Sequence, residues 1–527
     1  MSQSNLPLLI SSLQNPSLYT HDIQHFELIE THISWVLLTG PYAYKIKKPV
    51  NLGFLDFSRL EQRRIFCEEE LRLNRRLAPT FYLALVTISG SAEAPRLDGT
   101  GEPLEYAVKM KQFPQEALLS HCIQQGHITS THIDELAKSL ATFHAQCAIA
   151  EPSSEFGSPD LVRQIVLDNF QLLPAEAHKL ISKPQIDQLS QWATAEHRRC
   201  VKYFEKRKAE GFIRECHGDL HLGNIALVDD EIVIFDCIEF SKRFRWIDVM
   251  SEVAFVVMDL IDRSAPALGW RLLNGYLEQT GDYEGLHLLP YYMSYRAMVR
   301  AKVTGIRLAQ TGAEDSEHGD LTEELNKYLE LAASFTKPPN PMLIITHGLS
   351  GSGKTTVSQT LLESFGAIRI RSDIERKRLL GLSQEGRTEK QNLPLVYSKD
   401  STEATYAHLD ALARTILKSA FSVIVDATFL KQSYRDIFAT LAQDLHLPFV
   451  ILDIRAPVAT LRKRVEDRLS VGQDASEADI SVLEQQLSHD EPFSPTEQPL
   501  VLEVETEQPH HLDELLAAIQ PTLNSST

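Results

Sequence analysis

The hydrophobic pattern at the start of the chain is typical of a small sheet. Short runs rich in β-branched and aromatic residues dominate this part, and Gly40-Pro41 between two of them predicts a hairpin. A charged stretch with helical spacing, 59–77, separates the first two runs from the rest. The expected strands are 32–39, 42–48, 82–89 and 104–112.

From Ile133 onward the apolar residues recur mainly with the helical period of 3.6. Only 225–235 returns to strand-like spacing, as two short runs around Asp229-Asp230, which predicts a second hairpin. The expected helices are 133–147, 185–208, 247–262 and 291–310. The pattern therefore predicts a two-lobed α+β domain, in which a sheet lobe precedes a helical lobe.

The last third of the chain has a different order of elements. Three prolines within 338–341 cannot continue a helix, so we place a domain boundary near residue 338 and expect domains at 1–337 and 338–527. Beyond it, short buried-type strands alternate with helical stretches, which predicts an α/β domain with a parallel sheet and helices on both faces. The expected strands are 342–346, 367–371, 422–426 and 449–454.

Composition and charge narrow the class of protein. At 527 residues the chain is too long for one hydrophobic core, and its net charge of −19 would repel a phosphate backbone. No basic, apolar leader precedes the first domain, and apolar runs such as 253–260 are too short to span a bilayer. The six cysteines include no C-x-x-C pair. We therefore expect a cytoplasmic protein without a nucleic-acid or membrane partner, and leave its oligomeric state open.

A glycine-rich loop follows the first strand of the C-terminal domain. Residues 348–355 read Gly-Leu-Ser-Gly-Ser-Gly-Lys-Thr and match the P-loop pattern G-x-x-x-x-G-K-[ST]. In such a loop the backbone N–H groups hold the β-phosphate, the lysine reaches the β- and γ-phosphates, and the threonine hydroxyl binds Mg²⁺. The residues assigned to ATP are Gly348, Ser350, Gly351, Ser352, Gly353, Lys354, Thr355 and Thr356. The alternative is a glycine loop that only turns the chain.

Five further side chains complete this candidate site. Asp426 ends an apolar strand and is suited to support Mg²⁺, although it could instead cap a loop. Asp373 could orient or deprotonate an acceptor hydroxyl, and Arg376 could hold an anionic acceptor. Arg464 and Arg468 are four residues apart on one helix face and could neutralise a transferring phosphate, or could simply be solvated.

Residues 342–510 resemble the small P-loop kinases of the gluconate kinase and polynucleotide kinase type. The resemblance rests on the P-loop, on Ser372-Asp373-Ile374-Glu375-Arg376 and on Val425-Asp426-Ala427-Thr428. It also rests on Arg464-x-x-x-Arg468, followed by residues 474–478. The resemblance implies transfer of a phosphoryl group to a hydroxyl and leaves the acceptor undefined.

A second motif lies in the N-terminal domain. Residues 217–224 read His-Gly-Asp-Leu-His-Leu-Gly-Asn, which matches H-x-D-x-x-x-x-N, and Ile-Phe-Asp follows at 234–236. Phosphoryl transfer in a kinase fold needs a carboxylate near the acceptor and oxygen ligands for Mg²⁺. We expect Asp219 to be the base, with Asn224 and Asp236 as Mg²⁺ ligands that the hairpin brings together. The alternative is an ordinary polar loop.

This loop resembles that of the aminoglycoside phosphotransferase-like kinases, a family that includes choline and small-sugar kinases. The resemblance covers about residues 25–335 and implies a bilobal, kinase-like domain. By the same resemblance Lys45 pairs the α- and β-phosphates, with Lys47 on the same face as a rival. Glu70 is its helix partner, with Glu69 as an alternative. Met110, in 110–113, lies where the family places its adenine hinge.

The N-terminal domain also departs from the kinase pattern. No glycine-rich loop precedes Lys45, because residues 30–34 read Glu-Thr-His-Ile-Ser. Asp248 resembles a structural aspartate that supports the catalytic loop. The helix expected at 291–310 carries basic residues, among them Arg296 and Arg300, which favours a neutral or anionic acceptor unless that helix is a solvated face.

Together the two motifs predict a bifunctional kinase that phosphorylates hydroxyls of small molecules with ATP and Mg²⁺ at both sites. Three alternatives remain at this stage. One domain could be catalytic and the other an ATP-dependent regulator. The chain could be a non-catalytic ATP-binding switch, or a toxin-like P-loop kinase acting on a sugar nucleotide.

Overall fold

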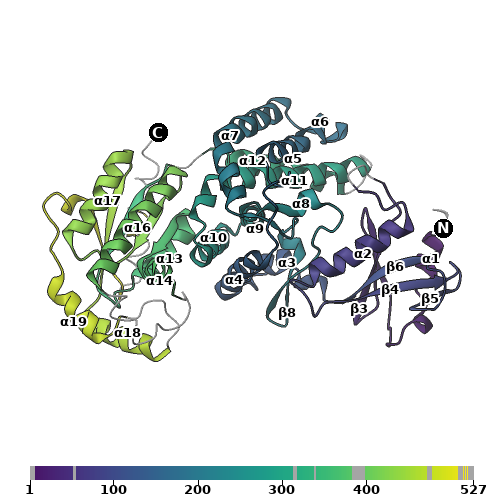
Figure 1. Cartoon of the computed structure of the whole chain (residues 1–527), viewed down its shortest axis with the longest axis horizontal. Helices are drawn as coiled ribbons and strands as arrows, with labels where there is room; N and C mark the ends of the chain where they lie inside the picture. Colours follow the sequence, from purple (N-terminus) through teal and green to yellow (C-terminus); the bar gives the residue numbers. More distant parts are fainter. Residues whose placement is uncertain are drawn as a thin grey trace. The chain divides into compact units, whose positions relative to one another are not determined.

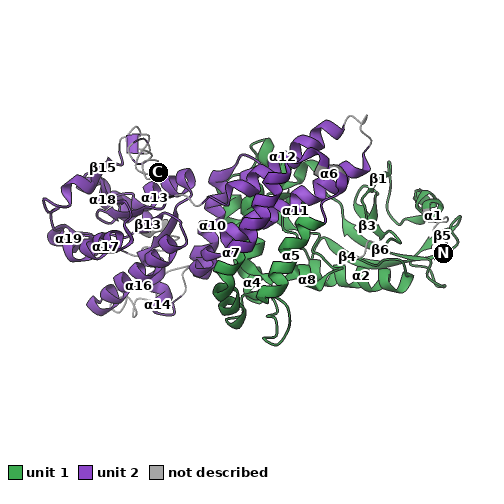
Figure 2. Ribbon diagram, turned by 90° about the horizontal axis from the view of Figure 1, so that it is seen from above, with its two compact units in different colours: residues 1–171, 197–259 green, residues 172–196, 260–527 purple. Residues whose placement is uncertain are grey.

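The computed structural model describes most of the chain: residues 6–51, 55–311, 317–337, 340–382, 398–471, 478–507, 514, 515, 517 and 519. The chain forms two compact units (Figure 2). Unit 1 comprises residues 1–171 and 197–259, and unit 2 comprises residues 172–196 and 260–527. Residue 338, where the domain boundary is expected, lies outside the described residues, so the ranges 1–337 and 338–527 stay a prediction.

Unit 1 contains a six-stranded antiparallel sheet with the order β1-β2-β3-β6-β4-β5 (Figure 1). Its strands are β1 (Glu27–Glu30), β2 (Ser34–Leu38), β3 (Tyr42–Lys47), β4 (Tyr82–Gly90), β5 (Pro95–Leu97) and β6 (Glu105–Lys111). Four of these confirm predicted strands, and β2 and β3 form the hairpin expected around Gly40-Pro41. Gly40 permits that turn because its φ is +93°.

Both faces of this sheet are covered. Leu9 and Leu13, from α1 (Leu6–Ser12) and its C-terminal end, pack into a cluster with sheet residues such as Ile46 and Ile88. On the other side, Cys67 and Leu71 of α2 (Leu60–Asn74) pack with Tyr82 and Val108. The charged stretch predicted as a helix at 59–77 is therefore α2, and its apolar stripe fixes it against β4 and β6.

The rest of unit 1 is mainly helical and holds the second predicted hairpin, β8 (Ile225–Val228) with β9 (Glu231–Ile234). A second two-stranded sheet pairs β7 (Ile213–Glu215) with β10 (Trp246–Asp248). The helices here are α3 (Leu119–Gln124), α4 (Ser130–Gln146), α5 (Pro159–Gln171), the C-terminal half of α7 (Lys183–Ala209), α8 (Lys242–Arg245) and most of α9 (Val249–Asp262). Helix α9 is buried almost completely, with residues 253–258 each 0% exposed, so any polar side chain on it must find a partner inside.

Unit 2 begins with helices. These are α6 (Ala175–Leu180), the N-terminal half of α7, α10 (Pro266–Thr280), the 3-10 helix η5 (Tyr283–His287), α11 (Leu289–Gln310) and α12 (Glu317–Ser334). Arg300 of α11 donates to Tyr328 of α12 at 3.2 Å, and Arg296 is buried. These two basic residues are therefore packed within the helices, and α11 is not a uniformly solvated face.

The C-terminal part of unit 2 is a five-stranded parallel sheet with the order β12-β13-β11-β14-β15. Its strands are β11 (Leu343–His347), β12 (Ile368–Arg371), β13 (Val423–Asp426), β14 (Phe449–Arg455) and β15 (Val501–Glu505). The first four confirm the predicted strands. The fifth was missed, because Val-Leu-Glu-Val-Glu lacks the continuous apolar run of its neighbours.

Helices cover both faces of this sheet, as predicted. Val357 and Leu361 of α13 pack against Ile344 and Leu452 on one face. Alternate strand residues such as Ile345 are buried too, and helices contact β11 and β13 there. The helices of this part are α13 (Lys354–Phe365), α14 (Ser372–Leu379), α16 (Lys399–Lys418), α17 (Gln432–Leu445), α18 (Val458–Val471) and α19 (Ile480–His489). Across the described parts of both units, we find no helix with the length and apolar character needed to cross a bilayer.

Candidate active sites

The first candidate site is built around a buried carboxylate that holds two lysines. Lys45 Nζ lies 2.9 Å from Glu70 Oε1 and 2.5 Å from Asp236 Oδ1. Lys47 Nζ lies 2.7 Å from Glu70 Oε2 and also donates to Glu239. Burial alone would raise the pKa of Glu70, but the two ammonium groups lower it to about 2.

Exposure separates the two rival lysines. The Lys47 side chain is fully buried, with its ammonium 5.0 Å from the centre of the Phe57 ring. Of the Lys45 side chain 12% is exposed, and the Asp236 carboxylate that it faces is 42% exposed. Lys45 is therefore placed to reach a ligand, whereas Lys47 is a structural partner of two carboxylates.

The catalytic loop brings the three other predicted residues together. Asn224 Nδ2 donates to the carbonyl oxygen of Asp219 at 2.9 Å. The hairpin then returns the chain, because the Phe235 N–H donates to the Asn224 carbonyl at 3.0 Å. Asp236 follows in the left-handed region with φ +66°, and its N–H donates to the Tyr82 hydroxyl at 3.1 Å. The loop and the hairpin that follows it therefore carry two carboxylates and one amide, and this donor set fits Mg²⁺.

Two carboxylates of α9 hold the backbone of this loop and were missed in the sequence. Glu252 accepts the N–H groups of His217 at 3.1 Å and Gly218 at 2.7 Å, and His144 Nε2 lies 3.1 Å away. Burial would raise the pKa of Glu252, but the contact with His144 and the loop amides lower it to about 2. Asp259 Oδ2 accepts the Leu222 N–H at 2.8 Å. The sequence signal that could have pointed to them is that Glu252 and Asp259 are seven residues apart, on one face of a mainly apolar helix.

Asp248, the residue expected to support the loop, forms a different contact. It makes a buried bidentate ion pair with Arg207, at 2.7 and 2.8 Å, and accepts the Met250 N–H. The loop amides of His217 and Gly218 are instead held by Glu252.

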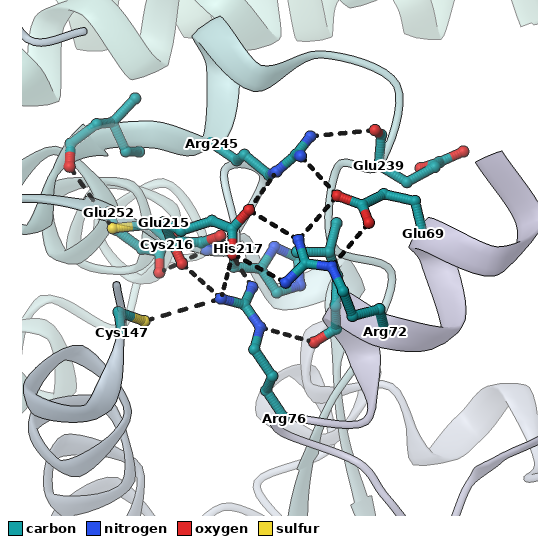
Figure 3. Close-up of polar contacts among 12 residues, drawn as sticks. Glu69, Arg72, Arg76, Cys147, Glu215, Cys216, His217, Glu239, Arg245 and Glu252 are labelled. Carbon is teal, nitrogen blue, oxygen red and sulfur yellow. Dashed lines mark hydrogen bonds and ion pairs between the residues drawn. The ribbon is translucent and has the colours of Figure 1, made fainter. Parts of the chain in front are cut away.

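A network of charged side chains ties α2 to the strand that precedes the catalytic loop (Figure 3). Arg72 donates to the Glu215 carboxylate at 2.8 Å, and Arg76 donates to the Glu215 carbonyl at 2.6 Å. Arg245 joins Glu69 at 2.6 Å to Glu215 at 3.2 Å. Glu69 therefore pairs with the arginines of the network, whereas Glu70, the next residue of the same helix, pairs with Lys45. The network also fixes α2 relative to the loop.

Met110, the predicted hinge residue, lies at the apolar wall of the first site. It packs in the cluster that contains Val108, Phe113 and Phe235. The rings of Phe113 and Phe235 meet edge to face at 5.1 Å, and Asp236 follows Phe235 directly. The predicted hinge thus adjoins the predicted metal ligand through these rings.

The second candidate site contains the P-loop, whose glycines are required by its shape. Gly348, Gly351 and Gly353 have φ values of +144°, +84° and +99°. A Cβ on Gly348 would lie 2.4 Å from the Ile454 carbonyl oxygen, which no side chain tolerates. The Lys354 ammonium donates to the carbonyls of Gly348 and Leu349 at 3.0 and 2.9 Å, and burial lowers its pKa.

The Mg²⁺ ligands expected at the second site are also adjacent. The Thr355 hydroxyl donates to Asp426 Oδ2 at 2.9 Å, and the Ser358 hydroxyl lies 3.4 Å from the same oxygen. The buried Ser352 hydroxyl has no hydrogen-bond partner among the described residues. A phosphate in the loop would satisfy such a donor, so the loop and its acidic partner fit Mg²⁺ and ATP.

A cavity of about 460 Å³ adjoins the P-loop, and predicted residues line it. These are Ser350, Gly351, Gly353, Lys354, Thr355, Thr356, Asp373, Arg376, Asp426, Arg464 and Arg468. Arg464 donates to the Gly351 carbonyl at 3.3 Å, and Arg468 donates to the Ala478 carbonyl at 2.8 Å. Both arginines therefore border the cavity. Of the motif at 474–478, only Ala478 lies within the described residues.

Other lining residues were not anticipated. The rings of Tyr406 and Tyr434 stack with centroids 3.9 Å apart and an angle of 3°, which gives the cavity a flat aromatic wall. Lys431 lies beside them, and the Gln486 side chain accepts the Ser350 N–H at 2.8 Å. They come from elements distant in sequence, so no local motif marks them.

Comparison with known proteins finds one family match in the N-terminal part of the chain and another in the C-terminal part. The family model described as "Phosphotransferase enzyme family" matches residues 55–289, and the one described as "AAA domain" matches residues 343–493. "Uncharacterized protein Rv2004c" of Mycobacterium tuberculosis is 30% identical over 458 residues, covering 86% of this chain and 89% of that protein. The chain belongs to the same family as this mycobacterial protein. "Uncharacterized protein Mb2027c" of Mycobacterium bovis matches equally.

The chain therefore carries an aminoglycoside phosphotransferase-like domain followed by a P-loop kinase domain, as predicted. Solved structures are more distant. A choline/ethanolamine kinase family protein from Mesorhizobium loti is 10% identical, with a TM-score of 0.35, and covers 63% of this chain and 99% of its own. A gluconokinase from Sinorhizobium meliloti is 22% identical, with a TM-score of 0.25, and covers 36% of this chain and 94% of its own. Likenesses this low carry no functional argument.

Proposed function

We propose that the chain is a bifunctional ATP-dependent phosphotransferase that acts on hydroxyls of small molecules, with Mg·ATP at both sites. The observation that carries the proposal is that each unit holds a cation for phosphate beside oxygen ligands for a metal. In unit 1 these are Lys45 with Asp236, and in unit 2 Lys354 with the Thr355–Asp426 pair. A chain that only binds ATP would need these sets alone, whereas here Asp219 and Asp373 add a carboxylate that can act on an acceptor hydroxyl at each site.

At the first site each residue has a separate task. Lys45, held by Glu70, binds the α- and β-phosphates, and Asn224 and Asp236 hold Mg²⁺. Bound Mg²⁺ neutralises the charge that develops on the phosphate oxygens. Asp219 orients the acceptor hydroxyl and takes its proton, since it lies next to Asn224 on the same loop.

At the second site the P-loop amides and Lys354 bind the phosphates of ATP, and Thr355 and Asp426 hold Mg²⁺. Asp373 lies on the cavity wall and orients the acceptor hydroxyl. Arg464 and Arg468 stabilise negative charge on the transferring group.

The charges of the second cavity favour an anionic acceptor. Lys354, Arg464 and Arg468 serve the triphosphate, and three further basic residues line the same cavity. Those basic residues are Arg371, Arg376 and Lys431. Asp373 and Asp426 are the carboxylates that line the described cavity, and Asp426 serves the metal. We therefore propose a small hydroxyl compound that carries a carboxylate or phosphate group.

The test uses purified full chain, Mg²⁺ and γ-labelled ATP with a polar metabolite extract. The proposal predicts a first-site product that Asp219→Asn abolishes and a second-site product that Lys354→Ala abolishes. If only one of the two variants removes label, the other domain is an ATP-dependent regulator, which is the alternative function. If the wild type labels no small molecule, the proposal is wrong.

A further inference from the structure

Helix α10 and η5 lie inside the segment that matches the phosphotransferase family, residues 55–289, yet they belong to unit 2 and contact the P-loop part of it. Asn274 of α10 is 2% exposed. Its Nδ2 donates to the Ala367 carbonyl at 3.0 Å, and its Oδ1 accepts the Arg369 N–H at 2.7 Å. Because β12 is an edge strand of the parallel sheet, Asn274 satisfies backbone groups that a neighbouring strand would otherwise bind.

Glu278, one turn further along α10, holds the end of the same strand. Its Oε1 accepts two hydrogen bonds from Arg369, from Nε at 3.0 Å and from Nη2 at 2.8 Å, and its Oε2 lies 3.9 Å from Arg371. Its backbone carbonyl accepts from Arg378 of α14. Arg371 lines the cavity of the second site, so Glu278 lies beside a residue of the cavity wall.

Tyr283 of η5 reaches α14 itself. Its buried hydroxyl donates to Glu375 Oε1 at 3.2 Å, and Glu375 is completely buried. Glu375 also pairs with Arg378 and with His408 at 3.2 Å. On the same helix Asp373 and Arg376 line the cavity, one on each side of Glu375 in sequence.

We infer that α10 and η5 are positioning elements of the second site, which hold β12 and α14 and thereby set where the acceptor binds. The inference rests on the function proposed for that site. The second site then depends on residues 274–283, which precede the P-loop by more than one helix and lie within the other family's match. The contacts described for Tyr283 reach α14 and not the P-loop glycines or Asp426, so Tyr283 should affect the acceptor more than ATP. Glu278 also bears on the ATP side, because its partner Arg369 donates to the Thr355 carbonyl at 3.3 Å.

The chain offers a matched control on the same helix. Arg271 of α10 pairs with Glu363 of α13 at 2.7 Å. Removing this pair also removes a contact between α10 and the P-loop part of unit 2. It leaves the contacts with β12 and α14 in place.

The experiment compares full-length wild type, Tyr283→Phe, Glu278→Gln and Arg271→Gln. For each, the second-site product is measured against extract concentration and, separately, against ATP concentration. Loss of a buried hydrogen bond to a charged group predicts that Tyr283→Phe raises the half-saturating extract concentration roughly five- to tenfold, with KM for ATP changed less than about twofold. Glu278→Gln should raise both constants, because Arg369 connects Glu278 to Thr355. Arg271→Gln should match the wild type in both.

The outcomes separate the two claims. If Tyr283→Phe changes both constants equally, or if either variant behaves like Arg271→Gln, the positioning role is wrong while the proposed function stands. If the wild type makes no product that depends on Lys354, the proposed function of the second site is wrong, and the inference is overturned with it.

Discussion

The Thr355 hydroxyl donates a 2.9 Å hydrogen bond to Asp426, although 71 residues separate the two in the chain. Thr355 is the second residue of α13, the helix after the P-loop, and Asp426 ends β13, the strand next to β11. Parallel strands end at one edge of the sheet, so the P-loop after β11 and the last residue of β13 must meet there. This geometry places both predicted metal ligands beside the P-loop.

Asp426→Asn tests this relationship. The substitution keeps the shape but removes the charge that supports Mg²⁺, so we expect the rate of the second-site product to fall roughly 100-fold or more. The Mg²⁺ concentration needed for half the remaining rate should rise. The first-site product is the internal control, and an equal loss of both products would contradict the assignment.

The two lysines of β3 should respond differently to replacement by methionine. Lys45→Met should abolish the first-site product and destabilise the fold less than Lys47→Met, because Glu70 keeps Lys47 as a partner and the Asp236 carboxylate is 42% exposed. Lys47→Met leaves the buried carboxylates of Glu70 and Glu239 without their common cation, at a cost of about 3–5 kcal/mol in the free energy of unfolding. Urea titration and product assays on both variants measure this split. Equal stability of the two would show that Lys47 is not the structural lysine.

Glu252 makes the stability of unit 1 sensitive to acid. Its pKa is lowered from 4.5 to about 2, so its contribution is fully present above about pH 4.5 and is lost as the pH falls towards 2. Glu252→Gln keeps the size of the side chain but cannot gain from ionisation. Between pH 6 and pH 3 the wild type should therefore lose more stability than the variant, by an amount on the order of 2–3 kcal/mol. Parallel urea curves across this pH range would contradict the role given to Glu252.

His347 should give the opposite pH dependence next to the P-loop. Burial alone would lower its pKa, but Asp453 at 2.8 Å and Asp490 at 3.1 Å raise it above 6.5. A raised pKa means that the stabilisation is fully present below about pH 6.5 and is lost as the pH rises through the folded-state value. Wild type should lose stability from pH 6 to pH 9, and His347→Gln should lose less over the same range. Amide hydrogen exchange of residues 484–493 locates the effect. After correction for the intrinsic pH dependence of exchange, the exchange rate of this segment should rise with pH in the wild type and not in His347→Gln.

Both phosphate-transfer motifs could be read from the sequence because each is continuous. The P-loop must place glycines where φ is positive, and the catalytic loop must carry its base and metal ligand five residues apart, so residue type and spacing suffice. The strands of the parallel sheet were equally visible, since burial on both faces leaves a continuous apolar run.

The features that could not be predicted from the sequence depend on contacts between segments that are distant in the chain. Lys45 and Lys47 have the same parity on β3 and share a face, so only their surroundings distinguish them. Glu252 reads as an ordinary helix acid until the loop amides are seen to lie against it. Asn274 carries no signal at all for a role at β12, because its partners are more than 90 residues away.

The central claim is that one chain contains two independent phosphate-transfer sites, and labelled products from four proteins test it most directly. Wild type, Asp219→Asn, Lys354→Ala and the double variant are each incubated with Mg²⁺, γ-labelled ATP and the same metabolite extract. We predict two products in the wild type, a different one missing in each single variant, and neither in the double variant. Loss of both products in one single variant, or survival of either product in the double variant, would contradict two independent sites.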